Sequence, residues 1–238
     1  PKEKVWLQER METIHNQTHF TAKGKRAILN RLADLIEANA QEFGKMAALD
    51  GGTPLMMGTG SVGTAVAWTR YYAGWCDKLS GEMISTLDTR GEFSYTVPEP
   101  IGIVGIIITW NGPLISLGMK VGPALAAGNA VVIKPASDTP LSAIKLTEVL
   151  LESGVPPEAV QCVTGSGSQI GDALVADPRV RKVTFTGSRD VGEHICKTAG
   201  LKKVTMELGS NSPLIIMPDA DIDKVVKATI SSGFSNAG

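Results

Sequence analysis

The sequence predicts an α/β fold: an open parallel β-sheet covered by helices, preceded by further helices and carrying a protruding β arm. Three observations lead to this prediction. From residue 101 onward, short apolar runs alternate with longer amphipathic stretches, which is typical of parallel strands joined by crossover helices. The apolar runs are unbroken, as expected for strands that are buried on both faces. Before residue 81 the pattern is helical.

The first part of the chain, residues 1–80, is predicted to be a helical part of the same domain. Residues 23–43 repeat apolar side chains at helical spacing. That face is made by Ile28, Leu32, Leu35 and Ile36. A second helical stretch covers residues 62–79, and Thr53 and Pro54 before it are the pair expected at a capping and a first helical position.

Residues 81–100 break the helical pattern. Phe93, Tyr95 and Val97 alternate there with polar residues, which predicts a strand with one exposed face. Because this strand lies between helices and a buried strand, we expect it to leave the main body as an arm. A surface hairpin within the domain is the alternative.

Residues 101–238 form the predicted Rossmann-like part. Six strands are predicted, over residues 101–109, 130–135, 159–165, 181–187, 202–209 and 213–218. Helices are predicted over residues 113–128, 139–154, 168–177, 188–200 and 219–230. Ligands of such sheets bind beyond the carboxyl ends of the strands, so the residues at those ends are the candidates for a site.

Composition narrows the classes of function. The net charge is -1, from 23 basic and 24 acidic residues, and aromatic residues make up 5%. Nucleic-acid binding is disfavoured, because it requires basic surfaces and stacking rings. No apolar run has the length of a membrane span. The three cysteines are no disulfide framework and the three histidines are not grouped as metal ligands, so we expect a cytoplasmic protein without a metal.

The candidate residues lie at the carboxyl ends of five of the predicted strands or just after them, and most of them are small, polar or charged. They are Thr109, Trp110 and Asn111, then Lys134 and Ser137, then Gly167 and Gly171, then Phe185, Gly187 and Ser188, and last Glu207, Leu208 and Gly209. Glycines before a helix start let a phosphate approach backbone N–H groups, although the same glycines would serve any tight turn. Their spacing differs from the G-x-G-x-x-G fingerprint, so a nucleotide would bind in a variant pose.

Three of these side chains have both a chemical and a structural interpretation. Asn111 can donate its amide to a developing oxyanion or can form an Asx turn. Glu207 can act as a general base, or as a cap or ion-pair partner. Lys134 can hold ribose hydroxyls or a 2′-phosphate, or can be a solvated lysine before a proline. The local pattern does not separate these alternatives.

Taken together, the motifs resemble those of the aldehyde dehydrogenase superfamily. The segments EPIGIVGIIITWNGPL, KVGPALAAGNAVVIKPASDTP, VTFTGSRDVG, VTMELGSNSP and DADID follow the order and spacing of that family. The resemblance covers nearly the whole chain. It implies a cofactor, NAD or NADP, and a small aldehyde substrate that is oxidised to a carboxylic acid through a cysteine thiohemiacetal and a thioester.

The resemblance also implies roles for single residues. Asn111 corresponds to the oxyanion amide, and Glu207 to the base that activates the hydrolytic water. The implied cofactor contacts are Thr109, Trp110, Lys134, Ser137, Gly167, Gly171, Phe185, Gly187, Ser188, Val191, Leu208 and Gly209. Residues 81–100 resemble the first arm strands of the family, which implies subunit contacts in a homodimer or homotetramer.

The nucleophile of the family is missing from this sequence. The family places a cysteine a few residues after an N-x-G segment, and this chain stops at Gly238. Cys76, Cys162 and Cys196 lie elsewhere and are expected to be buried structural thiols. We therefore expect the catalytic domain to be absent and the chain alone to be inactive.

Two further positions differ from many relatives. Ser137 stands where many NAD-preferring members carry a glutamate that would repel a 2′-phosphate, so we expect NADP to be tolerated. Gly112 stands where a bulky aromatic residue is common, so a wider substrate entry is expected.

Two other interpretations remain open. One is a non-catalytic cofactor-binding or structural module on the same fold. The other is a reductase of activated acyl groups, against which Glu207 argues because a reductase needs no water-activating base. The fold alone excludes neither of them.

Overall fold

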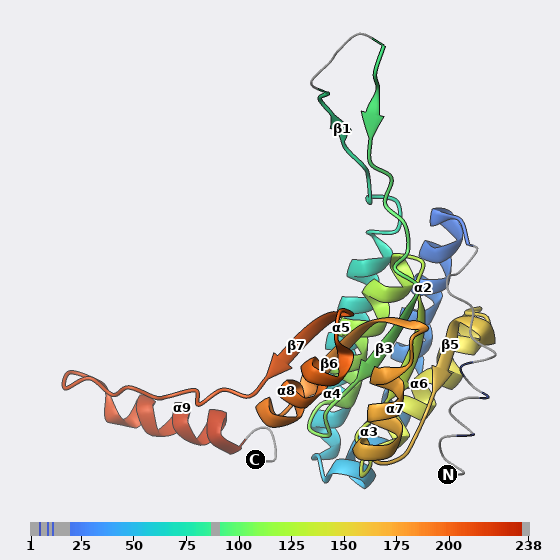
Figure 1. Ribbon diagram of the computed structural model, residues 1–238. Helices are drawn as coiled ribbons and strands as arrows, with labels where there is room; N and C mark the ends of the chain where they lie inside the picture. Colours follow the sequence, from blue (N-terminus) through green and yellow to red (C-terminus); the bar gives the residue numbers. More distant parts are fainter. Residues whose placement is uncertain (1–4, 6–8, 10, 12–19, 87–90, 235–238) are drawn as a thin grey trace.

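The computed structural model describes residues 5, 9, 11, 20–86 and 91–234 of the chain. At its centre lies a five-stranded parallel sheet in the order β5-β4-β3-β6-β7, with helices on both faces (Figure 1). The predicted fold class is therefore confirmed. The strands are β3 (Ile103–Ile107), β4 (Ala130–Lys134), β5 (Val160–Cys162), β6 (Val180–Gly187) and β7 (Lys203–Leu208).

The helices that join these strands begin and end at residues that favour a helix start or a helix end. They are α5 (Pro113–Ala126), α6 (Leu141–Ser153), the short η1 (Pro157–Ala159), η2 (Gly167–Gly171) with α7 (Asp172–Ala176), and α8 (Arg189–Ala199). Pro113 opens α5, where its missing N–H costs nothing. Gly154 ends α6 with a φ of 103°, which favours glycine. None of the helices in the described residues is both long and apolar enough to cross a membrane.

The amino-terminal helices are α2 (Ala22–Ala38), α3 (Ala40–Gly51) and α4 (Leu55–Ala73). The single helix predicted over residues 23–43 is wrong, because the chain breaks at Asn39. Its side-chain Nδ2 and its backbone amide both donate to the Leu35 carbonyl, at 2.8 and 3.1 Å, so Asn39 closes the last turn of α2.

Helix α4 also differs from its prediction. Pro54, and not Thr53, takes the capping position, with a φ of -53° and a ψ of 132°. The helix begins earlier than predicted and ends at Ala73, after which residues 74–77 form turns.

Two apolar cores hold the layers together, one on each face of the sheet. The first packs α2, α4, α5 and α6 against the sheet, and the second packs α7 and α8 against the opposite face. All five residues of β3 and of β4 are buried, which explains why these strands are apolar runs in the sequence up to Lys134, the last residue of β4.

The sheet ends at β7, and the prediction of a sixth strand over residues 213–218 is wrong. This segment forms neither a helix nor a strand, although residues 214–217 are four large apolar side chains in a row. Ile215 is 78% exposed. A strand exists only where its backbone pairs with a neighbour, and within the described residues nothing pairs with this segment. The helix that follows, α9 (Ile222–Phe234), stands off to one side of the sheet (Figure 1).

The predicted arm is an antiparallel hairpin of two short strands, β1 (Met83–Ile84) and β2 (Ser94–Tyr95), that protrudes from the body (Figure 1). The Thr96 amide donates to the Glu82 carbonyl at 2.9 Å, and the Glu82 amide donates to Thr96 Oγ1 at 2.8 Å. These bonds hold the base of the hairpin.

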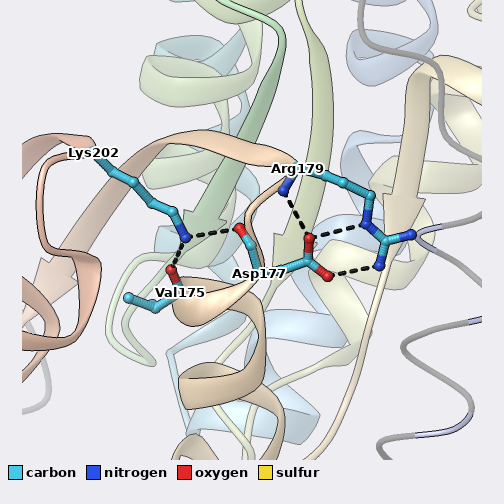
Figure 2. Close-up of polar contacts among 4 residues, drawn as sticks. All are labelled: Val175, Asp177, Arg179 and Lys202. Carbon is cyan, nitrogen blue, oxygen red and sulfur yellow. Dashed lines mark hydrogen bonds and ion pairs between the residues drawn. The ribbon is translucent and has the colours of Figure 1, made fainter.

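A cluster of charged residues ties together the amino-terminal ends of β6 and β7 (Figure 2). The Asp177 carboxylate accepts hydrogen bonds from the Arg179 amide, from its Nε and from its Nη2, at 2.9, 2.9 and 2.6 Å. Lys202 Nζ donates to the Asp177 carbonyl at 2.7 Å and also to the Val175 carbonyl. Burial acts to raise the pKa of the Asp177 carboxyl, but the hydrogen bonds and charge of Arg179 hold that pKa below its usual value.

Candidate cofactor and active site

The alternation of side chains along the strands divides the candidate residues between the two faces of the sheet. Ile133 belongs to the core under α5 and α6, and Val132 to the core under α7 and α8. Lys134 therefore points to the α7–α8 face. By the same alternation Leu208 lies on the α8 side of β7 and Glu207 on the α5 side. Lys134 and Leu208, which are candidates for cofactor binding, therefore lie on one face of the sheet. Glu207, the candidate base, lies on the opposite face.

Lys134 is a buried lysine at the carboxyl end of β4, with 3% of its surface exposed. Its Nζ donates to the Pro135 carbonyl at 2.8 Å, and its methylene groups lie 3.8 Å from the position of a Cβ on Gly171. Burial lowers the pKa of Lys134, and Cys162 acts in the opposite direction. The alternative of a solvated lysine is therefore wrong.

The turn after β5 and the nearby Ser137 carry polar groups that could contact a polar ligand. Ser137 Oγ donates to the Gly165 carbonyl at 3.1 Å. The buried Ser166 Oγ has no hydrogen-bond partner among the described residues. At Gly167, where η2 begins, an added Cβ would meet no atom within 4 Å. An open helix start beside a buried lysine suits the diphosphate of a nucleotide.

The next βα turn, between β6 and α8, is shaped by close packing. The Phe185 ring would lie 2.4 Å from a Cβ at Gly187, so a larger residue there would require this ring to move. Ser188 caps α8, because its Oγ accepts a hydrogen bond from the Val191 amide at 3.4 Å. Leu208 packs against Gly192 of α8, at 2.7 Å from the position of a Cβ. Val191 and Gly209 are exposed.

Asn111 lies at the start of α5, after the half-buried Thr109 and the exposed Trp110. It lines a hollow between α3, α4 and α5, together with Met57, Ser61 and Ile115; we call this the Asn111 hollow. Within the described part of the chain the Asn111 amide makes no hydrogen bond, so nothing supports the Asx-turn alternative. The amide is available to a ligand.

Glu207 is exposed at the end of β7, opposite Thr186 of β6. It lines a second hollow, of about 360 Å³, between α5 and strands β6 and β7; we call this the Glu207 hollow. Tyr72, Lys120, Lys182, Thr184 and Thr205 also line it. Among the described residues, no basic side chain forms an ion pair with the Glu207 carboxylate.

Lys120 is a residue of this hollow that the sequence pattern does not single out. It is 7% exposed and its Nζ lies 3.0 Å from Thr184 Oγ1. Burial lowers the pKa of Lys120, the charge of Glu207 counteracts this, and the charge of Lys182 adds to it. The only sign in the sequence is a charged residue inside the apolar helical stretch ISLGMKVGPAL.

The structure places Asn111 and Glu207 in different hollows. Both hollows lie on the α4–α5 face of the sheet, and α5 contributes residues to each of them. The described residues therefore do not bring the Asn111 amide and the Glu207 carboxylate into one enclosed pocket, although residues of α5 line both hollows.

The cysteines only partly match their prediction. Cys76 is buried after α4 and burial raises its pKa. Cys162 is half-buried at the end of β5. Cys196, in contrast, is exposed, because it lies on the outer face of α8, beside Lys197.

Comparison with known proteins supports a single family. The profile of the Aldehyde dehydrogenase family matches residues 10–238. The cytosolic 10-formyltetrahydrofolate dehydrogenase of Pongo abelii is 45% identical over 225 residues, and the mitochondrial succinate-semialdehyde dehydrogenase of Arabidopsis thaliana is 40% identical over 231 residues. These matches cover 92% and 95% of this chain, but only 25% and 43% of the relatives.

The solved structures agree with this assignment. Betaine aldehyde dehydrogenase from Staphylococcus aureus, solved in complex with NAD+, superimposes with a TM-score of 0.93 at 30% sequence identity. The match covers 99% of this chain and 49% of that chain. The chain thus spans about half the length of the solved structure, and less than half the length of each of the two curated relatives.

Proposed function

The chain belongs to the aldehyde dehydrogenase family, and we propose that it is the cofactor-binding part of an enzyme that oxidises a small aldehyde to a carboxylic acid with NAD or NADP. In this proposal residues 1–80 are the helical part of the cofactor domain, residues 81–100 the arm, and residues 101–238 the Rossmann-like part. The observation that carries it is the buried Lys134 beside Gly171 and the open start of η2.

The residues present fit a dinucleotide. Lys134 and Ser137 would hold the adenosine ribose, and the η2 start at Gly167 would face a phosphate. Ser166 Oγ, which is buried without a partner among the described residues, would gain one. The remaining implied contacts are Thr109, Trp110, Gly171, Phe185, Gly187, Ser188, Val191, Leu208 and Gly209. When bound, the nicotinamide accepts the hydride from the substrate carbon.

Two residues would serve the chemistry on the α5 face. Asn111 would donate its amide N–H to the substrate oxygen as negative charge develops there, and losing one such donor typically costs about 10²–10³ in rate. Glu207 would take a proton from the water that releases the acid. Lys120 lies near enough for its charge to interact with Glu207, so we assign it a positioning role toward this carboxylate.

The thiolate nucleophile is not supplied by the described cysteines in this proposal. Cys76 is buried, Cys162 ends β5 and Cys196 lies on the outer face of α8. We therefore expect no NAD(P)-dependent oxidation of aldehydes by these 238 residues alone. Turnover by the purified chain would contradict this part of the proposal.

The arm and the exposed apolar residues on it support further parts of the proposal. Phe93 and Tyr95 are 69% and 61% exposed, with ring centroids 5.4 Å apart. We assign this surface to subunit contacts in a homodimer or homotetramer, and we place the enzyme in the cytoplasm.

Binding of 5′-ADP, NAD and NADP to the chain, measured by isothermal titration calorimetry, tests the proposal. All three ligands should bind, and Lys134→Met should weaken each of them at least about tenfold, because a charged hydrogen-bond donor is lost. The control is Lys23→Met, an exposed lysine in the first turn of α2. The absence of 5′-ADP binding, or equal effects of the two substitutions, would overturn the proposal.

A further inference from the structure

We propose that Thr184 is a positioning residue for the candidate base: its hydroxyl holds the Lys120 ammonium against β6 and so keeps it from forming an ion pair with Glu207. The inference rests on the proposed function, because it assumes that Glu207 takes a proton from water. Thr184 touches neither that water nor the substrate in this proposal, and it acts only through Lys120.

The Glu207 hollow holds more positive than negative charge. Three of the residues that line it are charged, namely Glu207 on β7, Lys182 on β6 and Lys120 on α5, and Tyr72 of α4 is the other titratable side chain there. Burial lowers the pKa of Lys120 and the charge of Glu207 counteracts this, so the two charges act on each other across the hollow. Buried charges are normally paired. The absence of an ion pair between them in the described part of the chain therefore needs a physical reason.

The hydroxyl of Thr184 supplies that reason. Lys120 Nζ donates to Thr184 Oγ1 at 3.0 Å, and both residues are buried, with 7% and 6% of their surfaces exposed. Val183 and Phe185 pack on the α7–α8 face of the sheet, so Thr184 between them points to the α5 face. The strand thus presents an acceptor toward α5, and the ammonium gains a charge-assisted hydrogen bond without a carboxylate.

The second lysine of the hollow is held in the same way. Lys182 Nζ donates to Thr205 Oγ1 at 2.7 Å, and Thr205 is the partner of Thr184 in the register of β6 and β7. The two hydroxyls therefore lie on neighbouring strands, and each accepts a hydrogen bond from one ammonium. Thr205 is exposed whereas Thr184 is buried. The bond to Thr184 should have the larger effect, because water competes less with it.

This arrangement leaves the oxygen atoms of the candidate base open to a water molecule. A carboxylate in a direct ion pair is a weaker base, because the nearby positive charge favours its ionised form, typically by about one to three pH units. The ammonium would also occupy an oxygen atom that the water has to reach. With Lys120 held on Thr184, its charge still acts within the hollow, but the Glu207 carboxylate stays unpaired among the described residues.

The test follows the Lys120 side chain by NMR in the 238-residue chain, with lysine labelled isotopically at Cε and Lys120→Met to assign the signal. Thr184→Val removes the acceptor at nearly the same size. Lys120 should then pair with Glu207, and its pKa should rise by about one pH unit. The rise should vanish when Glu207→Gln is added. An unchanged or lower pKa of Lys120 in Thr184→Val, or a rise that persists with Glu207→Gln, would overturn the proposal.

Three more substitutions separate positioning from a loss of stability. Thr184→Ser keeps the hydroxyl and should give the pKa that Lys120 has in the wild type. Thr184→Ala removes the acceptor without adding volume and should show the same rise as Thr184→Val. The matched control is Thr69→Val, because Thr69 is also buried and its Oγ1 donates to the Ala65 carbonyl of its own helix at 2.8 Å. Equal effects of Thr184→Val and Thr69→Val, or a failure of Thr184→Ser to restore the pKa, would refute the positioning role.

Binding of 5′-ADP is measured on the same samples. An unchanged pKa of Lys120 in Thr184→Val, with 5′-ADP bound as in the wild type, would overturn this inference and leave the proposed function standing. Failure of the wild-type chain to bind 5′-ADP would overturn the proposed function and, with it, the inference that rests on it.

Discussion

The two ends of the sheet differ in whether their polar groups have hydrogen-bond partners. At the amino-terminal end the Asp177 carboxylate is bound by Arg179, and Lys202 donates to two carbonyl groups (Figure 2). At the carboxyl end Ser166 Oγ is buried with no hydrogen-bond partner among the described residues, and Asn111 lines an open hollow. Buried or half-buried polar groups without partners cost stability. The first end is therefore built for stability, and the second keeps groups available for a ligand.

The largest effect should come from breaking the amino-terminal cluster. Asp177→Ala removes a carboxylate whose side chain is 9% exposed, and with it the three hydrogen bonds that this carboxylate accepts from Arg179. We expect a loss of about 3 kcal/mol in the free energy of unfolding, since breaking a buried pair costs about 3–5 kcal/mol and this one is partly exposed. Urea denaturation measures it, with the exposed Asp138→Ala as control. Binding of 5′-ADP should not change; a loss of binding would show that the two ends are coupled.

A substitution at the carboxyl end should act on the ligand and not on the fold. Ser137→Glu places a negative charge beside the 2′ position, so NADP should bind about tenfold more weakly while NAD changes less than twofold. Ser137→Gln, which is similar in size and uncharged, is the control. Calorimetry measures both cofactors. If Ser137→Glu weakens NAD as much as NADP, the assignment of Ser137 to the 2′ position is wrong.

Ser188 has both a structural role and a proposed binding role, because it caps α8 and also lies at the candidate site. Ser188→Ala should cost about 1 kcal/mol of stability through the lost cap. The exposed Ser80→Ala serves as comparison. Thermal denaturation in the absence of ligand measures the effect of the cap. A change below the error of the measurement would mean that the 3.4 Å contact to the Val191 amide is too long to matter.

The smallest effect should be a dependence on pH. The folded pKa of Asp177 lies below its usual value, so this group contributes stability that is fully present above the unfolded pKa. That stability is lost as the pH falls through the folded pKa. Urea midpoints should therefore decline below about pH 4 more steeply in the wild type than in Asp177→Asn. Parallel curves for the two proteins would show that the pairing with Arg179 contributes nothing.

The sequence pattern predicts most of the sheet, because burial of a strand on both faces requires apolar residues and these are visible in the sequence. Strands β3 and β4 are buried on both faces, so all their positions except Lys134 at the end of β4 are apolar or glycine and the run is visible in the sequence. The helix ends are predicted where one residue decides them, as at Gly154 and Ser188.

The predictions that failed depend on contacts with the rest of the chain. Residues 213–218 are as apolar as a buried strand, but pairing cannot be read from composition. The break at Asn39 is an exception, because it is local: Asn disfavours helix interiors and favours helix ends, and the continuous apolar periodicity masked this signal. Cys196 is exposed because of the orientation of α8, which periodicity alone predicts poorly for a cysteine.

What the sequence by itself determined is the family, the parallel sheet and the set of residues that follow its strands, because each of these is written in local order and spacing. Only the tertiary structure decided that Lys134 is buried, that Lys120 lies with Glu207, and that Asn111 and Glu207 line separate hollows. These facts depend on which faces of the helices and strands meet. That is settled by packing between segments far apart in the chain, and no single segment carries the information.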